Sequence, residues 1–148
     1  SEKLQIKIEK RKDIMTKNEI IISLQKGINP YEEYYIENKV MEAMLEYPNP
    51  FELVAPILEI IESNPDIDFG TPGYLVHFVE KFYKKGYEEL LLKSVRKNPT
   101  IHNIWMLHRC YIDEDNPLHS KFALLIKEIK EDKSVSSKVK KVIEEFSW

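Results

Sequence analysis

The chain has 148 residues, of which 43% are hydrophobic and 32% charged, a balance typical of a folded globular protein and not of a disordered chain. No apolar run approaches the roughly 20 residues that a membrane-spanning helix needs. The single cysteine, Cys110, excludes an internal disulfide and fits a reducing compartment. With no apolar leader segment at the N-terminus, we expect one cytoplasmic domain spanning residues 1–148.

Asn-Pro pairs at residues 29, 49, 64, 98 and 116 mark the expected helix boundaries. Asn caps the free N–H groups of a helix start, and Pro is well tolerated in the first turn. The pairs at 29, 49 and 116 precede periodic apolar runs and predict helix starts, whereas those at 64 and 98 follow such runs and predict helix ends. The predicted helices span residues 3–14, 16–26, 30–47, 50–63, 72–85, 87–97, 100–112, 117–132 and 135–146.

Three sequence patterns qualify these helices. Residues 3–14 also alternate as a strand would. Pro56 should kink the helix at 50–63 or mark its true start. The helix at 30–47 has two apolar stripes, which predicts a place in the middle of a stack. One stripe is Ile36, Val40, Met44 and Tyr47, and the other is Tyr34, Met41 and Leu45.

The fold class predicted by these paired helices and short turns is all-α. The Asn-Pro pairs at 64 and 98 are 34 residues apart, which suits an α–α superhelical stack of the HEAT or armadillo kind. The other Asn-Pro pairs are unevenly spaced, and this favours an irregular bundle instead. We therefore expect about eight helices in one of these two arrangements.

Acidic residues are concentrated between Asn29 and Asp68. This segment contains ten acidic residues and one basic residue, Lys39. Basic residues exceed acidic ones in residues 1–28 and 69–112. An acidic block beside such basic flanks argues against a general nucleic-acid binder, which needs a continuous positive surface. An acidic face instead favours a basic protein partner. The residues that we expect to present it are Glu42, Glu46, Glu52 and Glu59.

Catalytic and cofactor motifs were sought without success. The four histidines lack the spacing of zinc or di-iron sites, and the chain has no cysteine pair. There is no nucleophile elbow, and Gly70-Thr-Pro-Gly73 is too short for a phosphate loop and lacks its lysine. We expect no catalytic residue, no metal and no cofactor, and hence a protein that is not an enzyme.

Two segments carry the remaining functional candidates. In residues 70–80, His77 and Glu80 lie off the apolar stripe of the predicted helix and are free to face a neighbouring helix or a partner. In residues 98–109, Trp105 is expected to anchor the core, and Arg109 to pair with Asp113 one turn later. The acidic cluster Asp113-Glu114-Asp115 follows, either as a solvated turn or as an extension of the acidic surface.

The same two segments carry a resemblance to a known family. A Pro-Gly-x-Leu-Val-His-Phe-Val-Glu helix followed by a Pro-Thr-x-x-x-x-Trp-Met-Leu-x-Arg helix, within residues 70–112, resembles small helical immunity proteins of bacterial polymorphic or contact-dependent toxin systems. The resemblance implies a cytoplasmic protein that binds a cognate toxin domain and blocks its active site. Many such toxins are basic nucleases, which the acidic block would suit by mimicking nucleic acid.

Two other function classes stay open. A HEAT-like adaptor would bind a cellular protein or peptide through a concave helical surface. An enzyme would need His77, Glu80, His108 or Arg109 to converge in one pocket.

Overall fold

The computed structural model describes residues 14–148, which form eight α-helices and one 3-10 helix, with no strand among them. The all-α prediction is therefore confirmed. The helix expected over residues 3–14 lies outside the described residues, apart from its last position. The elements are α2 (Lys17–Lys26), α3 (Asn38–Glu46), η1 (Pro50–Leu53), α4 (Val54–Ser63), α5 (Tyr74–Glu80), α6 (Tyr87–Lys97), α7 (Ile101–Tyr111), α8 (His119–Glu131) and α9 (Ser137–Glu144).

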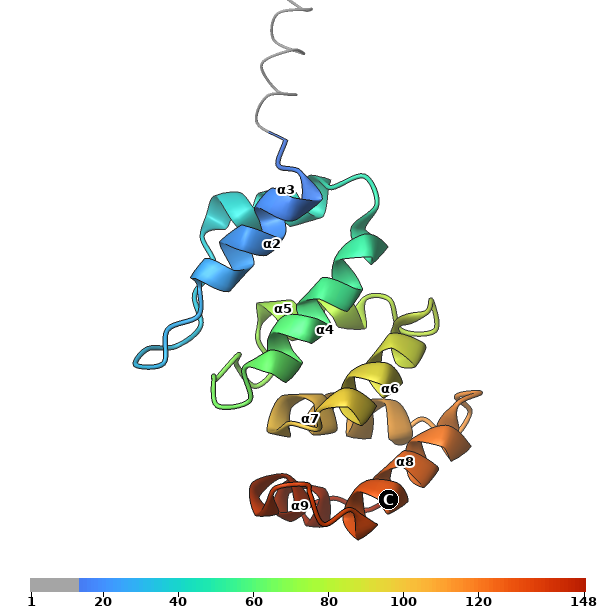
Figure 1. The fold of residues 1–148 in the computed structure, drawn as a ribbon. Helices are drawn as coiled ribbons and strands as arrows, with labels where there is room; N and C mark the ends of the chain where they lie inside the picture. The colour runs from blue at the N-terminus through green and yellow to red at the C-terminus, as the bar shows by residue number, and fades with distance from the viewer. Residues whose placement is uncertain (1–13) are drawn as a thin grey trace, which may run out of the picture.

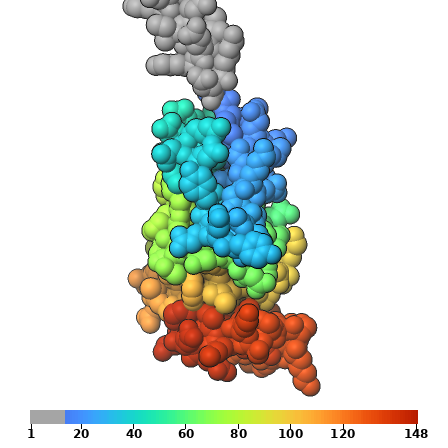
Figure 2. Space-filling view, turned by 90° about the vertical axis from the view of Figure 1, so that its left-hand side faces the viewer, coloured from blue at the N-terminus to red at the C-terminus, as the bar shows by residue number. Residues whose placement is uncertain are grey.

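The helices are stacked as successive pairs in two layers. In Figure 1, α2, α4, α6 and α8 form the layer nearer the viewer, and α3, α5, α7 and α9 lie behind them. Figure 2 views the layers from the side, with α3 and α5 on its left and α2 on its right. The α4 helix packs on α6, α6 on α8 and α7 on α9, so each helix pair contacts the next pair along the chain. Successive pairs therefore pack side by side along the molecule within an all-α fold.

One continuous hydrophobic core joins the pairs, from Ile20 in α2 to Ile143 in α9. Met44, Ile57 and Phe122 are fully buried in it. Each such side chain stabilises the fold by about 1.5–3 kcal/mol relative to an exposed position. Among residues 14–148, no helix has both the length and the apolar character needed to cross a bilayer.

Helix ends follow the Asn-Pro pairs as predicted. Asn64 is the C-cap of α4 and donates from Nδ2 to the Ile60 carbonyl at 2.8 Å. Asn98 is the C-cap of α6, and its Nδ2 donates to the Glu62 carbonyl at 2.7 Å, which ties the end of α6 to the end of α4. Asn thus ends a helix at both positions, and Asn98 also ties two neighbouring helices together.

Helix starts follow the pairs less closely. Pro50 opens the 3-10 helix η1, and α4 begins four residues later with Pro56 in its first turn. Asn116 accepts a hydrogen bond from the Leu118 N–H, and α8 starts only at His119. The predicted start at Asn29 is wrong, because its Oδ1 accepts from the Tyr31 N–H at 3.0 Å in a local turn that competes with a helix. Residues 28–37 form a loop, so α3 begins only at Asn38.

Two other predictions need correction. Of the two stripes expected at 30–47, the one with Val40 and Met44 is buried, but Leu45 is 62% exposed. The α3 helix packs on α2 at the N-terminal end of the described stack and not in its middle (Figure 1). The helix expected over 72–85 is also shorter, since α5 ends at Glu80 and turns follow.

Candidate binding groove between α3, α5 and α7

The turn between α4 and α5 depends on two glycines. Gly70 has a φ of +99°, a left-handed value that other residues rarely adopt. A Cβ on Gly73 would lie 1.6 Å from the Phe69 carbonyl oxygen, so only glycine fits there. Asp68 fixes the turn by accepting from the Gly70 N–H at 2.8 Å. The glycines of this segment therefore serve a tight turn.

The loop at 28–37 is held against that turn by backbone contacts. The Tyr35 N–H donates to the Gly27 carbonyl at 3.3 Å, an approach that requires glycine because a Cβ there would meet the Tyr35 oxygen at 2.0 Å. The Tyr34 N–H donates to the Asp68 carbonyl at 3.4 Å, and its hydroxyl donates to the Leu24 carbonyl at 2.7 Å. The loop is thus a defined part of the surface.

A groove of three adjoining cavities runs from this loop down to α7. The upper cavity, of about 300 Å³, shares Gly70 and Thr71 with the middle one, of about 170 Å³. Arg109 belongs both to the middle cavity and to the lower one, of about 300 Å³. The upper cavity is lined by Glu33, Tyr34, Ile36, Met41, Asp68, Phe69, Gly70, Thr71, Gly73 and Tyr74.

The middle cavity has Trp105 and His102 in its wall. Trp105 is partly buried and meets the His102 ring edge-on at 5.3 Å, so it is a wall of the groove rather than a fully buried anchor. His102 Nε2 lies 3.3 Å from the Phe69 nitrogen and 3.1 Å from the Ile67 oxygen. Burial lowers the pKa of His102, which favours the neutral ring. His102 therefore holds the residues before the glycine turn.

The lower cavity contains the ion pair between Arg109 on α7 and Glu80 on α5, with Nε and Oε2 2.7 Å apart. The expected pairing of Arg109 with Asp113 is wrong, because Glu80 of the neighbouring pair lies closer. Cys110 lines the same cavity but is buried, and burial raises its pKa to about 12. Its thiol therefore stays protonated and is no nucleophile near neutral pH.

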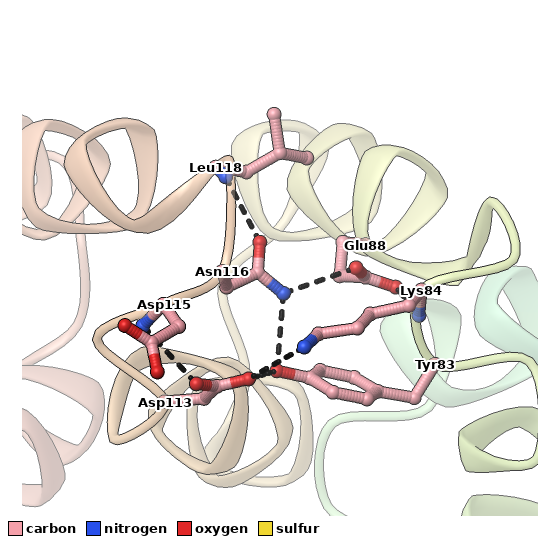
Figure 3. A network of polar contacts seen from close by, with 7 residues as sticks. All are labelled: Tyr83, Lys84, Glu88, Asp113, Asp115, Asn116 and Leu118. Atoms are coloured by element: carbon pink, nitrogen blue, oxygen red, sulfur yellow. Dashed lines mark hydrogen bonds and ion pairs between the residues drawn. The ribbon is translucent and has the colours of Figure 1, made fainter.

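Asp113 takes part in an internal network instead (Figure 3). Its Oδ2 accepts from the Tyr83 hydroxyl at 2.5 Å and lies 3.4 Å from Lys84 Nζ. Asn116 donates from Nδ2 to the Tyr83 oxygen and to Glu88 Oε2, each at 3.1 Å. We call Tyr83, Lys84, Glu88, Asp113 and Asn116 the Asp113 network. It joins the α5–α6 turn to the α7–α8 turn, so it stabilises the stack.

Titration of the network follows from these contacts. The hydrogen bond from Tyr83 lowers the pKa of Asp113, since it stabilises the carboxylate. Burial and the bond to Asp113 raise the pKa of Tyr83 to about 12. Of the predicted cluster Asp113-Glu114-Asp115, only Glu114 and Asp115 are fully exposed.

The four predicted acids are all exposed but come from different elements. Glu42 and Glu46 lie one turn apart on α3, in the rear layer of Figure 1, whereas Glu59 lies on α4 in the front layer. Glu52, in η1, accepts from the Tyr47 hydroxyl at 2.9 Å. Glu62 belongs to the same acidic block but is buried, with Lys97 3.5 Å away. The acidic residues between Asn29 and Asp68 are therefore distributed over several surfaces and do not form one acidic face.

Three large exposed side chains of α3 and of the loop before it were not predicted as site residues. Tyr31 is 93% exposed and Tyr35 66%, both in the loop that joins α2 to α3, and Leu45 on α3 is 62% exposed. We call Tyr31, Tyr35, Glu42, Leu45 and Glu46 the α3 surface. The run Tyr-Glu-Glu-Tyr-Tyr after Asn29-Pro30 could have indicated exposed tyrosines, because its tyrosines do not fall on a single apolar stripe of a helix.

The histidine candidates lie apart from the ion pair. His77 is exposed on α5, and His108 stacks on Phe146 with ring centroids 4.2 Å apart. Of the four residues that an enzyme would need, only Glu80 and Arg109 meet. Within residues 14–148, no three His, Cys, Asp or Glu side chains are placed to hold a metal ion.

The groove and the α3 surface thus provide aromatic walls, exposed carboxylates and one partly buried ion pair. This arrangement suits recognition of another molecule. No family model, curated protein or solved structure matches the chain.

Proposed function

We propose that this protein is an immunity protein, which binds a cognate bacterial toxin domain and masks its active site. The resemblance of residues 70–112 motivates the toxin as partner. Support for a binding role comes from the α3 surface, because its large side chains Tyr31, Tyr35 and Leu45 are each more than half exposed. Large side chains of this kind, tyrosine above all, are enriched at the centres of protein interfaces.

The charge of the same surface supports a basic partner. Glu42 and Glu46 are exposed, and no ion pair or hydrogen bond engages their carboxylates within residues 14–148. Such carboxylates are available to a cationic surface and speed its association. A nuclease domain, whose substrate-binding surface is positive, is the partner class that we propose.

A growth-rescue assay tests the immunity role. The toxin domain encoded beside this gene is induced in a sensitive host with and without the immunity protein. We expect growth only when both proteins are present, and loss of rescue for a Tyr31→Ala, Tyr35→Ala double variant. Ile112→Ala, at a side chain 63% exposed at the C-cap of α7, is the matched control. Failure of the wild-type chain to protect against that toxin would refute the immunity role.

An adaptor that binds a cellular peptide is the second candidate, and the groove of three adjoining cavities favours it. An adaptor would capture its ligand without protecting cells from any toxin. The growth assay therefore separates the two candidates.

A further inference from the structure

The upper cavity of the groove has a negative lining. Among the described residues that line it are Glu33 and Asp68, and no lysine, arginine or histidine. Lys39, a base on the neighbouring helix, is 3.3 Å from the Glu37 carboxylate. The cavity therefore has acceptors for positive charge and no base of its own to neutralise them.

The rest of the lining is aromatic and apolar. Tyr34 packs on Phe69 with ring centroids 4.9 Å apart, and Tyr74 reaches across from α5 with its hydroxyl 3.4 Å from the Met41 carbonyl. Aromatic rings attract cations at their faces, and guanidinium groups also stack on them. A cavity of aromatic rings with two carboxylates thus has the chemistry that recognises a long cationic side chain.

The shape of the cavity is fixed before any ligand arrives. Asp68 is held by the Gly70 N–H, and its own carbonyl holds Tyr34. The turn that carries Asp68 is closely packed, since a Cβ at Gly73 would lie 1.6 Å from the Phe69 carbonyl oxygen. Binding in such a site loses little conformational entropy.

We propose that the upper cavity binds an arginine side chain of the partner protein. The aliphatic stem lies along Met41 and Tyr74, and the guanidinium meets the carboxylates of Glu33 and Asp68. Arginine fits better than lysine, because its planar group both stacks on tyrosine and bonds two acceptors. In the immunity complex the arginine belongs to the toxin domain, so this role rests on the proposed function.

A small probe tests the cavity without the toxin. N-acetyl-arginine amide is titrated into the 15N-labelled full chain, with N-acetyl-citrulline amide as the neutral isostere and N-acetyl-lysine amide as the second cation. We expect saturable shifts at the amides of Gly70, Thr71 and Gly73 with arginine and none with citrulline. No saturable shift, equal citrulline binding, or shifts confined to other residues would overturn the site. Lysine binding as tight as arginine binding would overturn the guanidinium assignment.

Charge-neutral variants localise the effect. Glu33→Gln with Asp68→Asn removes both charges but keeps an acceptor oxygen for the Gly70 N–H. We expect about fivefold weaker arginine binding, in line with two partly exposed ion pairs. Glu59→Gln, on α4 outside the cavity, is the control and should bind as the wild type does. Unchanged arginine binding by the double variant, with a spectrum that shows the variant to be folded, would overturn the proposal.

The two proposals can fail separately. Arginine binding without growth rescue would keep the cavity and refute the immunity role. Growth rescue without arginine binding would keep the immunity role and refute the arginine site.

Discussion

The Asp113 network and the α3 surface are both rich in acids, but they use them differently. In the network, Glu88 and Asn116 are buried, and Asp113 is bonded to Tyr83 and paired with Lys84. On the α3 surface, Glu42 and Glu46 are exposed, and no ion pair or hydrogen bond engages their carboxylates within residues 14–148. The number of acids in a segment therefore says little about its role, whereas their burial and partners separate stabilising groups from groups free to bind.

Removing the centre of the network should cost the most stability. Asn116→Ala deletes two donated bonds and the one accepted from Leu118, and leaves the buried Glu88 carboxylate short of a partner. We expect a loss of about 3 kcal/mol in the free energy of unfolding, measured by urea denaturation. Glu42→Ala, on the α3 surface, should stay within about 0.5 kcal/mol of wild type. Equal losses of unfolding free energy in Asn116→Ala and Glu42→Ala would contradict the distinction between the Asp113 network and the α3 surface.

A tyrosine of the α3 surface should show the opposite pattern. Tyr31 is 93% exposed, so Tyr31→Ala should leave the unfolding midpoint unchanged. Calorimetric titration of the cognate toxin domain should show about 30-fold weaker binding, the equivalent of about 2 kcal/mol at an interface hot spot. Ile112→Ala should bind normally. Wild-type affinity in Tyr31→Ala would place the interface elsewhere.

The Glu80–Arg109 pair should lie between these extremes. The side chains are 23% and 37% exposed, so water screens the pair in part. We expect Glu80→Gln to destabilise the fold by about 1 kcal/mol, seen as a melting temperature about 2–4 °C lower. Glu46→Gln, which breaks no ion pair, is the control. A melting temperature equal to that of the control would show that the pair contributes nothing.

The smallest effect concerns pH. The pKa of Asp113 is depressed, so its contribution to stability is present above its ordinary value of 3.8 and is lost as pH falls through the lower value in the folded state. The pKa of Tyr83 is raised from 10.0 to about 12, so its contribution is present below pH 10 and is lost as pH rises through that interval.

Unfolding free energies measured across both intervals check this dependence. Asp113→Asn should remove the acid-side dependence. Tyr83→Phe should weaken the acid-side dependence and remove the alkaline-side one, because phenylalanine has no hydroxyl to titrate. If Tyr83→Phe kept the acid-side dependence of the wild type, the bond between the two residues could not be its cause.

The parts of the fold that the sequence predicts are those with local causes. Asn64 ends α4 through a bond to Ile60 four residues earlier, and Thr16 starts α2 through a capping box with Glu19. Such contacts lie within one turn of helix, so their pattern is visible in the sequence. Residues 30–37 were predicted as the start of a helix but form a loop, which is held partly by a contact that is not local, the bond between Tyr34 and Asp68.

The candidate site was less predictable for the same reason. Arg109 has an acid one turn away in sequence, but its partner Glu80 comes from the neighbouring helix pair. Glu62 and Glu88 count as surface charge in a sequence, yet both are buried. Glu33 and Asp68 share a cavity only because two turns separated by α3 and α4 meet. The candidate site is formed by side chains from different helix pairs, so no single segment of the sequence contains it.

The backbone bonds that hold the loop at 28–37 bear on the kinetics of recognition. Because the loop is already ordered by Gly27, Leu24 and Asp68, an incoming partner does not have to wait for it to fold. Encounter should then be limited by diffusion and electrostatic steering, with rates that fall as salt rises. Substitutions at the tyrosines should act on the lifetime of the complex, and substitutions at the surrounding carboxylates on its rate of formation.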